Sequence, residues 1–274
     1  MYFHCGLYRF DLSRPLVMGI LNVTPDSFSD GGMYSKRDVA ISRAMQLIEE
    51  GADIIDVGGE STRPGAEPVS LQEELDRVLP VVEALKGVPV SIDTFKPEVM
   101  KAGIALGAAM INDIDALQNP DAMDAVSRSD AAVCLMHKKG SPKTMQHQPD
   151  YGDVVSEVME FLKIRMDAAL TSGIAPDRIV IDPGFGFGKT LEHNLKLLHN
   201  LAEFKKLNAP LLAGLSRKSM LGAITGQDAE HRMAASLAAA LIAAERGAAI
   251  LRVHDVRATV DAIKVWDAVN RGRA

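Results

Sequence analysis

The sequence predicts an α/β protein folded as a single-domain (β/α)₈ barrel, or TIM barrel, over residues 1–274. Short apolar runs of strand type recur along the chain, and longer segments of helical type separate them. Eight such units of even spacing favour closure of the sheet over an open, doubly wound sheet. The runs stay apolar until their last residues, as expected of strands that are covered on both faces.

The strand candidates share a Val-, Ile-, Leu- or Ala-rich body and a polar end. They are residues 15–22, 53–57, 88–93, 108–113, 131–137, 178–182, 209–215 and 249–254. For the opening segment, YFHCGLYRFDL, two interpretations stay open: a short N-terminal hairpin that closes the bottom of the barrel, and a disordered lead-in.

A helix is expected after each strand. The helix candidates are residues 37–50, 70–86, 97–107, 119–128, 152–172, 191–206, 229–246 and 255–271. Pro97 suits a first helical turn, and Gly107 and Gly247 suit helix ends. The segments 24–36 and 58–70 exceed the usual strand-to-helix connection and are rich in Gly, Ser and Pro, which is typical of active-site lids.

Composition excludes several classes of protein. The formal net charge is -6, and the Lys and Arg residues are scattered, which argues against a nucleic-acid partner. Neither a signal peptide nor an apolar stretch of about 18 residues is present, so no membrane partner is expected. Cys5 and Cys134 lack metal-type spacing, and Cys134 lies in an apolar run as a buried free thiol would, which fits a cytoplasmic location.

Polar side chains at the strand ends are the candidates for chemistry, because active sites of (β/α)₈ barrels lie at the carboxyl ends of the strands. Each one alone is better explained as a helix cap or a turn residue. Together they converge on one mouth and favour a site for a polar, anionic ligand. The set includes Asn22, Thr62, Arg63, Asp93, Asn112, Asp182, Lys218, Ser219, Arg252 and His254.

The cations in this set suit phosphate, which arginine can grip with two hydrogen bonds. The segment SRKSMLG (216–222) could add free N–H groups at a short helix N-terminus, although Arg217 is interpreted as a solvated surface charge. Asp93, Asn112 and Asp182 suit the N–H and carbonyl edge of a nitrogen heterocycle.

The glycine-rich segment DPGFGFGKT (182–190) departs from a nucleotide-binding P-loop, since Pro183 stands where the first glycine is required. Its glycines instead suggest a tight turn, with Phe185 in the core and Phe187 able to stack on a flat ring. Lys189 is expected to begin a helix. For His137, Lys138 and Lys139, a turn on a solvated face remains one of two open interpretations.

Taken together, these segments resemble the dihydropteroate synthase family. The motifs occur in the family's order and spacing along almost the whole chain. They are MGILNVTPDSFSDGG (18–32), DVGGESTRPGA (56–66), SIDT (91–94), IND (111–113), DPGFGFGKT (182–190), GLSRKSMLG (214–222) and RVHD (252–255). One departure follows strand five, where the family usually continues Met-Gln-Gly and this chain has Lys138, Lys139 and Gly140.

The resemblance implies an enzyme, a transferase of folate biosynthesis that joins 6-hydroxymethyl-7,8-dihydropterin diphosphate to p-aminobenzoate and releases pyrophosphate. It also implies Mg²⁺ dependence, a homodimer and inhibition by sulfonamides. Two rivals stay open: a catalytically silent pterin-binding paralogue and a methyltetrahydrofolate:corrinoid methyltransferase. Intact motifs for metal, phosphate and lids argue against both.

The resemblance also implies residue roles, with Lys218 and an electrostatic Asp93 as the catalytic pair. Asn22 would meet the metal and, with four others, the diphosphate: Thr62, Arg63, Arg252 and His254. The pterin would contact Asp93, Asn112, Met136, Asp182, Phe187 and Lys218. The p-aminobenzoate pocket would comprise Phe28, Pro64 and Ser219.

Overall fold

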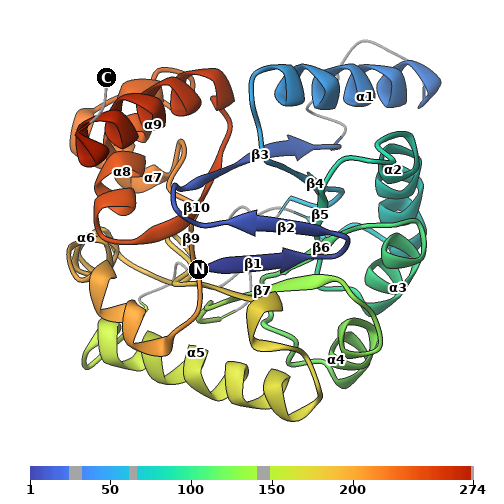
Figure 1. The fold of residues 1–274 in the computed structure, drawn as a ribbon, viewed down its shortest axis with the longest axis horizontal. Coiled ribbons are helices and arrows are strands. Elements are labelled where there is room, and N and C mark those ends of the chain that lie inside the picture. The colour runs from blue at the N-terminus through green and yellow to red at the C-terminus, as the bar shows by residue number, and fades with distance from the viewer. Residues whose placement is uncertain (25–32, 62–66, 141–148, 273–274) are drawn as a thin grey trace.

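The computed structural model describes residues 1–24, 33–61, 67–140 and 149–272. Within these ranges eight parallel strands close into a barrel, in the order β10-β3-β4-β5-β6-β7-β8-β9 (Figure 1). The strands are β3 (Leu16–Asn22), β4 (Ile54–Gly58), β5 (Val90–Asp93), β6 (Met110–Asp113), β7 (Ala132–Met136), β8 (Ile179–Asp182), β9 (Leu211–Ala213) and β10 (Ala248–Val253). The predicted (β/α)₈ barrel is therefore confirmed.

Helices surround this ring; they lie between successive strands of the chain, except α9, which follows the last strand β10 (Figure 1). The α-helices of the described residues are α1 (Met33–Glu49), α2 (Leu71–Ala84), α3 (Pro97–Ala105), α4 (Pro120–Ser127), α5 (Val154–Thr171), α6 (Leu191–His199), α7 (Ser219–Thr225), α8 (Met233–Glu245) and α9 (Val256–Arg271). Two 3₁₀ segments, η2 (Pro176–Arg178) and η3 (Leu201–Leu207), precede β8 and β9.

Local sequence signals explain several helix boundaries. Ser70 caps α2 by accepting a hydrogen bond from the backbone N–H of Glu73 at 3.3 Å. Pro97 is the first residue of α3, as predicted, because its missing N–H leaves no helical bond unmade there. The predicted stops at Gly107 and Gly247 are also confirmed, since both follow their helices with positive φ.

Three predicted helix boundaries differ from the structure by more than two residues. Helix α1 begins at Met33, four residues earlier than expected. The helix expected over 191–206 is divided at Asn200 into α6 and η3. The helix expected from residue 229 begins only at Met233, because the Arg232 guanidinium turns back to the carbonyl oxygens of Gln227 (2.9 Å) and Arg217 (3.1 Å).

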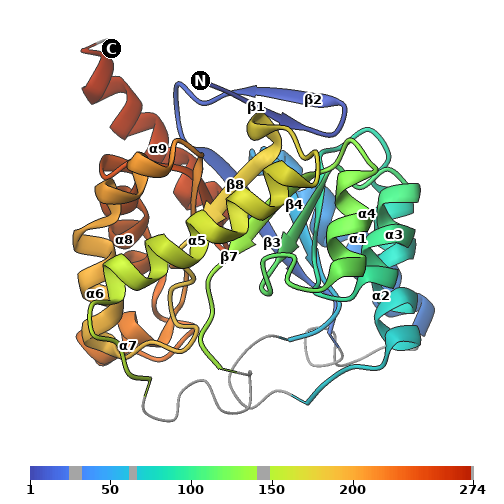
Figure 2. The same ribbon diagram turned by 90° about the horizontal axis from the view of Figure 1, so that it is seen from below.

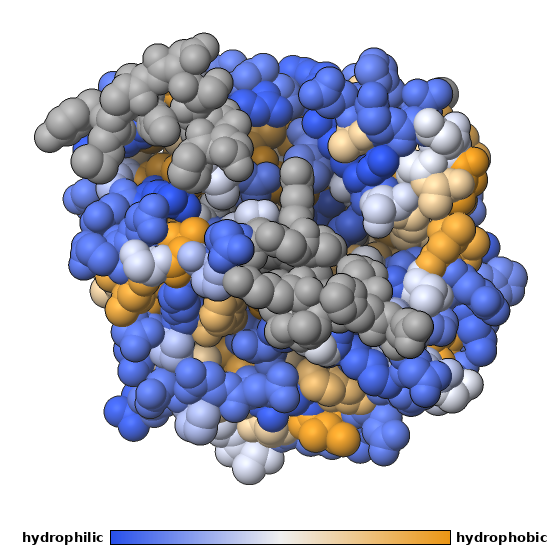
Figure 3. All heavy atoms as spheres, turned by 180° about the vertical axis from the view of Figure 1, so that it is seen from behind, coloured by the Kyte–Doolittle hydropathy of each residue, from blue (hydrophilic) through white to orange (hydrophobic). Residues whose placement is uncertain are grey.

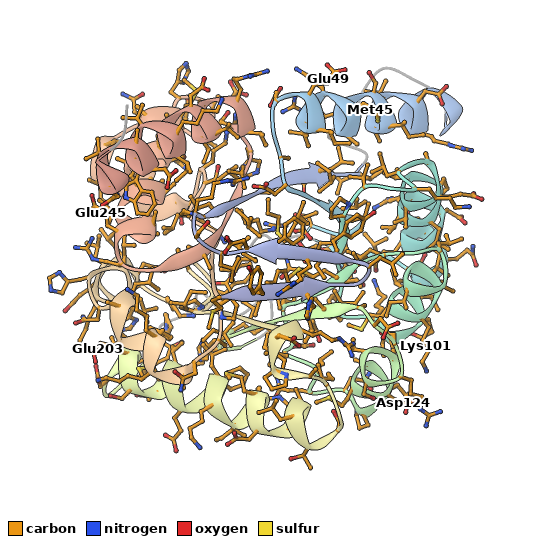
Figure 4. All side chains as sticks on the ribbon, viewed as in Figure 1. Met45, Glu49, Lys101, Asp124, Glu203 and Glu245 are labelled. Atoms are coloured by element: carbon orange, nitrogen blue, oxygen red, sulfur yellow. The ribbon has the colours of Figure 1, made fainter. Side chains whose placement is uncertain are left out.

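The core has two parts because strand side chains alternate between the two faces of the sheet. Outward side chains such as Val17, Ile55 and Ile181 pack beneath the helices. Inward side chains fill the barrel, and buried Cys134 is among them. Side chains crowd the ring, whereas labelled ones such as Glu245 on the covering helices point away from it (Figure 4).

The hairpin interpretation of the N-terminus is confirmed. β1 (Tyr2–Cys5) and β2 (Tyr8–Asp11) pair antiparallel and lie across one end of the barrel (Figure 2). Phe3 and Cys5 are fully buried and pack on the inward residues Met18 and Met110. This end is therefore sealed, and the carboxyl ends of the strands open at the other. No helix in the described ranges is long and apolar enough to cross a membrane.

Candidate active site

The register of the sheet brings polar residues from successive strands to one level of the barrel mouth. Asn22 of β3 pairs with Gly58, Gly58 pairs with Asp93, and Asp93 pairs with Asn112. On the opposite side of the barrel, Met136 of β7 pairs with Asp182 of the neighbouring strand β8. The face opposite the hairpin is largely hydrophilic over the residues that carry colour in Figure 3.

Arg252 lies at the centre of the mouth between two buried carboxylates. Its Nε donates to Asp56 Oδ2 at 2.6 Å and its Nη2 donates to Asp93 Oδ2 at 2.6 Å. The Asn112 side chain donates to the same oxygen of Asp56 at 3.1 Å. Because a planar guanidinium fixes both directions at once, the two carboxylates and the amide are held in one orientation.

Two oxygens of this cluster accept no hydrogen bond from any described residue. They are Asp56 Oδ1 and Asp93 Oδ1, both buried. A buried carboxylate oxygen without a donor is costly, which indicates a ligand that supplies N–H groups there. Burial raises the pKa of Asp93 to about 7; the Arg252 guanidinium opposes the rise and Asp56 adds to it.

Asp182 is held by the glycine-rich turn that follows it. The Gly184 N–H donates to Asp182 Oδ1 at 2.7 Å. Gly184 has a φ of +68°, and a Cβ there would overlap the carbonyl oxygen of His137, so the predicted need for glycine is confirmed. Burial raises the pKa of Asp182, and the Gly184 hydrogen bond and Lys218 oppose that rise.

Lys218 caps the N-terminus of α7, and its Nζ lies 4.1 Å from the ring centroid of Phe187. Arg217 before it has a φ of +57° and is tied to Asp255 by two hydrogen bonds of 3.1 and 2.5 Å. Arg217 is partly solvated, as interpreted, with 34% of its side chain exposed, but its ion pair with Asp255 was not expected. Ser219 is the first, exposed residue of the short helix expected here.

His254 reaches the mouth just after β10. Its backbone N–H donates to Ser216 Oγ at 3.2 Å, and its ring Nδ1 lies 3.0 Å from the same oxygen. Ser216 is buried, and its hydroxyl oxygen holds the imidazole ring in place. His254 is half-buried and lies two residues after Arg252, beyond the end of β10.

Asn22 is the described residue best suited to a metal. An ideal Cβ on Gly58 would lie 3.8 Å from both Asn22 Oδ1 and Asp93 Oδ2, so both oxygens face the same narrow space. The described residues contain no cluster of three or more His, Cys, Asp or Glu side chains that could hold a metal. One amide oxygen fits Mg²⁺ only when substrate phosphates and water supply its other ligands.

Four predicted site residues lie outside the described residues: Phe28, Thr62, Arg63 and Pro64. The neighbouring Glu60 is described and forms an ion pair with Lys96, which also pairs with buried Glu74. Thr94 donates to Glu74 at 2.6 Å, which links this ion-pair network to the residue after Asp93.

Asp56 is a member of the site that was not predicted, although it is a charged residue inside an apolar strand, a pattern that marks a buried, paired carboxylate. The structure corrects the prediction for Lys189 and decides between the two interpretations of His137. Lys189 does not begin a helix: it is 3% exposed, and α6 begins at Leu191 behind the cap residue Thr190. His137 is 5% exposed, so it does not lie on a solvated turn. Phe185 is in the core, as predicted.

Residues 18–254 match the model of a protein family described as pterin binding enzyme. Dihydropteroate synthase of Escherichia coli (strain K12) is 52% identical over 261 residues, which are 94% of this chain and 93% of that protein.

Solved structures agree with this similarity. The dihydropteroate synthase of Burkholderia cenocepacia complexed with 7,8-dihydropteroate is 52% identical, with a TM-score of 0.91 and coverage of 99% of this chain and 97% of that one. The Yersinia pestis dihydropteroate synthase in a sulfonamide drug complex is 48% identical, with a TM-score of 0.93 and coverage of 99% and 100%.

Proposed function

The chain belongs to the dihydropteroate synthase family of pterin-binding enzymes, and we propose that its mouth cluster joins a pterin to an aromatic amine. It is a transferase of folate synthesis. It condenses 6-hydroxymethyl-7,8-dihydropterin diphosphate with p-aminobenzoate, and 7,8-dihydropteroate and pyrophosphate are the products. One observation carries the assignment of the site: buried carboxylate oxygens without donors face the space between Arg252, Asn112 and Asp93.

In this proposal the pterin ring occupies that space. Its N–H groups donate to Asp93 and Asp182. The Asn112 side-chain amide forms hydrogen bonds with an edge of the ring that carries both a donor and an acceptor. Phe187 and Met136 border the ring, and Lys218 contacts it from the α7 turn. The proximity of Lys218 Nζ to the Phe187 ring supports a shared contact surface for a flat ligand.

The diphosphate lies toward Asn22, Arg252 and His254, with Thr62 and Arg63 completing the anion site. Asn22 would hold Mg²⁺ together with the phosphate oxygens. The bound metal supplies positive charge that neutralises the departing pyrophosphate. Arg252 and His254 add to this neutralisation from the strand β10 side, where burial in a low dielectric strengthens their effect.

The reaction breaks the bond between the methylene carbon and the diphosphate oxygen, and pyrophosphate leaves with the electron pair. Positive charge then spreads into the electron-rich pterin, where ionised Asp93 and Asp182 stabilise it. The amine nitrogen of p-aminobenzoate forms the new C–N bond and loses one proton to solvent. No side chain is needed as a nucleophile, and no general base is assigned.

The p-aminobenzoate pocket would comprise Phe28, Pro64 and Ser219 beside Lys218. We propose that the pterin substrate binds first, because the connections from β3 to α1 and from β4 to α2 would act as lids that complete this pocket. Binding of p-aminobenzoate measured with and without pterin diphosphate tests the order. Equal affinities in the two cases would contradict it.

We further propose that residues 1–274 act as one cytoplasmic, pterin-binding domain, that sulfonamides compete at the p-aminobenzoate pocket, and that the enzyme is a homodimer. Exposed apolar side chains on α7, α8 and α9 support the dimer: Ile224, Met233, Ile242, Val265 and Val269. Light scattering of the purified chain tests the mass, and a monomer at micromolar concentration would rule the dimer out.

The decisive assay follows pyrophosphate release and dihydropteroate formation from pterin diphosphate and Mg²⁺. We expect product only when p-aminobenzoate is present. Asp93→Asn should keep its fold and lose most turnover. Full turnover with normal pterin binding in that variant would contradict the electrostatic role of Asp93. Tight pterin binding without any product from the wild type would indicate a silent paralogue instead.

A further inference from the structure

Lys189 is a buried cation that the proposed reaction does not use. It lies directly after the glycine-rich turn 183–188 and is only 3% exposed. Its Nζ forms no ion pair with any carboxylate of the described residues at hydrogen-bond distance. Burial lowers the pKa of Lys189 to about 7, so the charged form depends on the groups that its amine contacts.

The Nζ of Lys189 has three close acceptors. They are His137 Nδ1 at 2.9 Å, the Gly184 carbonyl oxygen at 2.9 Å and the Phe187 carbonyl oxygen at 3.1 Å. An ammonium has three N–H donors, so this set satisfies the protonated side chain completely. When Lys189 is protonated it has no acceptor atom of its own, so Nδ1 of His137 must accept and the proton of the neutral ring is on Nε2. Burial, followed by the charge of Lys189, lowers the pKa of His137 to about 3.

Each of the three residues that accept from Lys189 either belongs to the proposed pterin site or is hydrogen-bonded to a residue of it. Gly184 accepts from Lys189 through its carbonyl oxygen and donates its N–H to Asp182 Oδ1 at 2.7 Å. Phe187 is held by its carbonyl oxygen while its ring lies against Lys218. The His137 N–H donates to the Asp182 carbonyl oxygen at 3.0 Å, so the ends of β7 and β8 are joined as well.

Two other residues of the turn have separate supports. Asn194 of α6 accepts from the Gly186 N–H at 2.7 Å, and the Tyr151 hydroxyl donates to the Gly188 carbonyl oxygen at 2.9 Å. Within the turn, the Phe187 N–H donates to the Gly184 carbonyl oxygen at 3.2 Å. Lys189 is the side chain that binds both of these residues, through their carbonyl oxygens.

We propose that Lys189 is a positioning residue of the pterin site, whose buried amine holds Gly184 and Phe187 of turn 183–188 so that Asp182 and Phe187 face the pterin ring. This inference rests on the proposed function. It assigns a role in pterin affinity to a residue that touches no substrate. Its effect should therefore appear in pterin binding and leave the separate p-aminobenzoate pocket nearly unchanged.

The test uses Lys189→Met, which keeps the length of the side chain and removes its donors. With Mg²⁺ present, we expect the Kd for pterin diphosphate to rise about ten- to one-hundredfold, the size of a lost charge-assisted hydrogen bond. The KM for p-aminobenzoate should change less than about threefold. Lys196→Met is the matched control, because Lys196 lies half-exposed on α6 and pairs only with Asp153 among the described residues; its pterin Kd should equal that of the wild type.

Lys189→Gln, which keeps two donors, should fall between the wild type and Lys189→Met, and it replaces the methionine variant if that variant does not fold. A folded Lys189 variant with wild-type pterin affinity would overturn the inference and reduce Lys189 to a purely structural role. Failure of the proposed function is distinguishable from this result, because the wild type itself would then form no dihydropteroate.

Discussion

At the residue scale, the mouth of the barrel concentrates charge in a buried place. Asp56, Asp93 and Arg252 share two hydrogen bonds of 2.6 Å, and Asp56 is fully buried. Such a cluster is a weak source of stability by itself, since desolvation offsets the attraction. Removal of one member is costly, however, because the remaining charges lose their partner.

Asp56→Asn tests the strength of this cluster. We expect the free energy of unfolding to fall by about 3 kcal/mol, the lower end for a broken buried pair, because Arg252 keeps Asp93. The pKa of Asp93 should fall as well, since the Asp56 carboxylate raises it. Urea denaturation measures the first effect.

Asp53→Asn serves as the matched control on the same stretch of chain. Asp53 also pairs with an arginine, Arg14, but that guanidinium is half-exposed at the other end of the strand. Its loss should cost about 1 kcal/mol or less. Equal losses in the free energy of unfolding for Asp56→Asn and Asp53→Asn would contradict a stronger coupling of charges in the buried cluster.

Asp93 also makes a pH-dependent contribution to stability. Its folded pKa is raised from 3.8 to about 7 by burial, so the native state binds more protons than the unfolded state between these values. Stability contributed by Asp93 is therefore lost as the pH rises from about 4 to 7. In urea denaturation from pH 4 to 8, the wild type minus Asp93→Asn difference should follow this fall. A stability difference that grows as the pH rises would contradict the raised pKa of Asp93.

At the element scale, the turn after β8 depends on close approach between two segments. A Cβ on Gly184 would overlap the His137 carbonyl oxygen, and one on Gly188 would overlap the Lys139 carbonyl oxygen. The backbone that follows β7 and the backbone of the glycine-rich turn are therefore in direct contact. The departure of this chain from the family, at Lys138 and Lys139, falls on that same strand end, where Lys138 pairs with Asp115 at 2.5 Å.

Gly184→Ala should cost more than about 3 kcal/mol of stability and lower pterin affinity, because both the positive φ and the overlap oppose a side chain. Gly173→Ala isolates the first of these effects. Gly173 has a φ of +96° and no atom within 4 Å of its ideal Cβ, so its cost should stay near 1–2 kcal/mol. Thermal unfolding and pterin titration measure both. Similar losses of stability at the two positions would show that the overlap with His137 adds little to the cost of the positive φ.

At the scale of the whole molecule, stability and chemistry are assigned to opposite ends of the barrel. The hairpin seals one end with Phe3, which is fully buried, while the turn residue Leu7 is 96% exposed. Phe3→Ala should lower the free energy of unfolding by about 3–5 kcal/mol through the cavity it leaves, and Leu7→Ala by less than about 0.5 kcal/mol.

Turnover per folded molecule should be unchanged in both hairpin variants, since the geometry of the mouth does not depend on the hairpin side chains. Steady-state kinetics at a temperature where Phe3→Ala remains folded checks this. A selective loss of kcat in that variant would show that the bottom of the barrel is coupled to the site.

The predictable part of the site consists of residues at strand ends. Asp93, Asn112 and Asp182 were predictable because parallel strands bring their carboxyl ends to one edge, whatever the detailed packing. Asp56 and Lys189 were not recognised, because their roles depend on partners that only folding supplies. Arg252 lies 196 residues from Asp56, and His137 lies 52 residues from Lys189.

By itself, the sequence determined the barrel, the order of its elements, the hairpin as one of two options and the family motifs, since apolar periodicity, turn chemistry and strand ends are local properties. The tertiary structure alone decided which charges are buried or paired: the bridge from Arg252 to two carboxylates, the ion pair of Arg217 with Asp255 and the enclosed amine of Lys189. Burial and pairing depend on distances between segments far apart in the chain, and no local pattern encodes them.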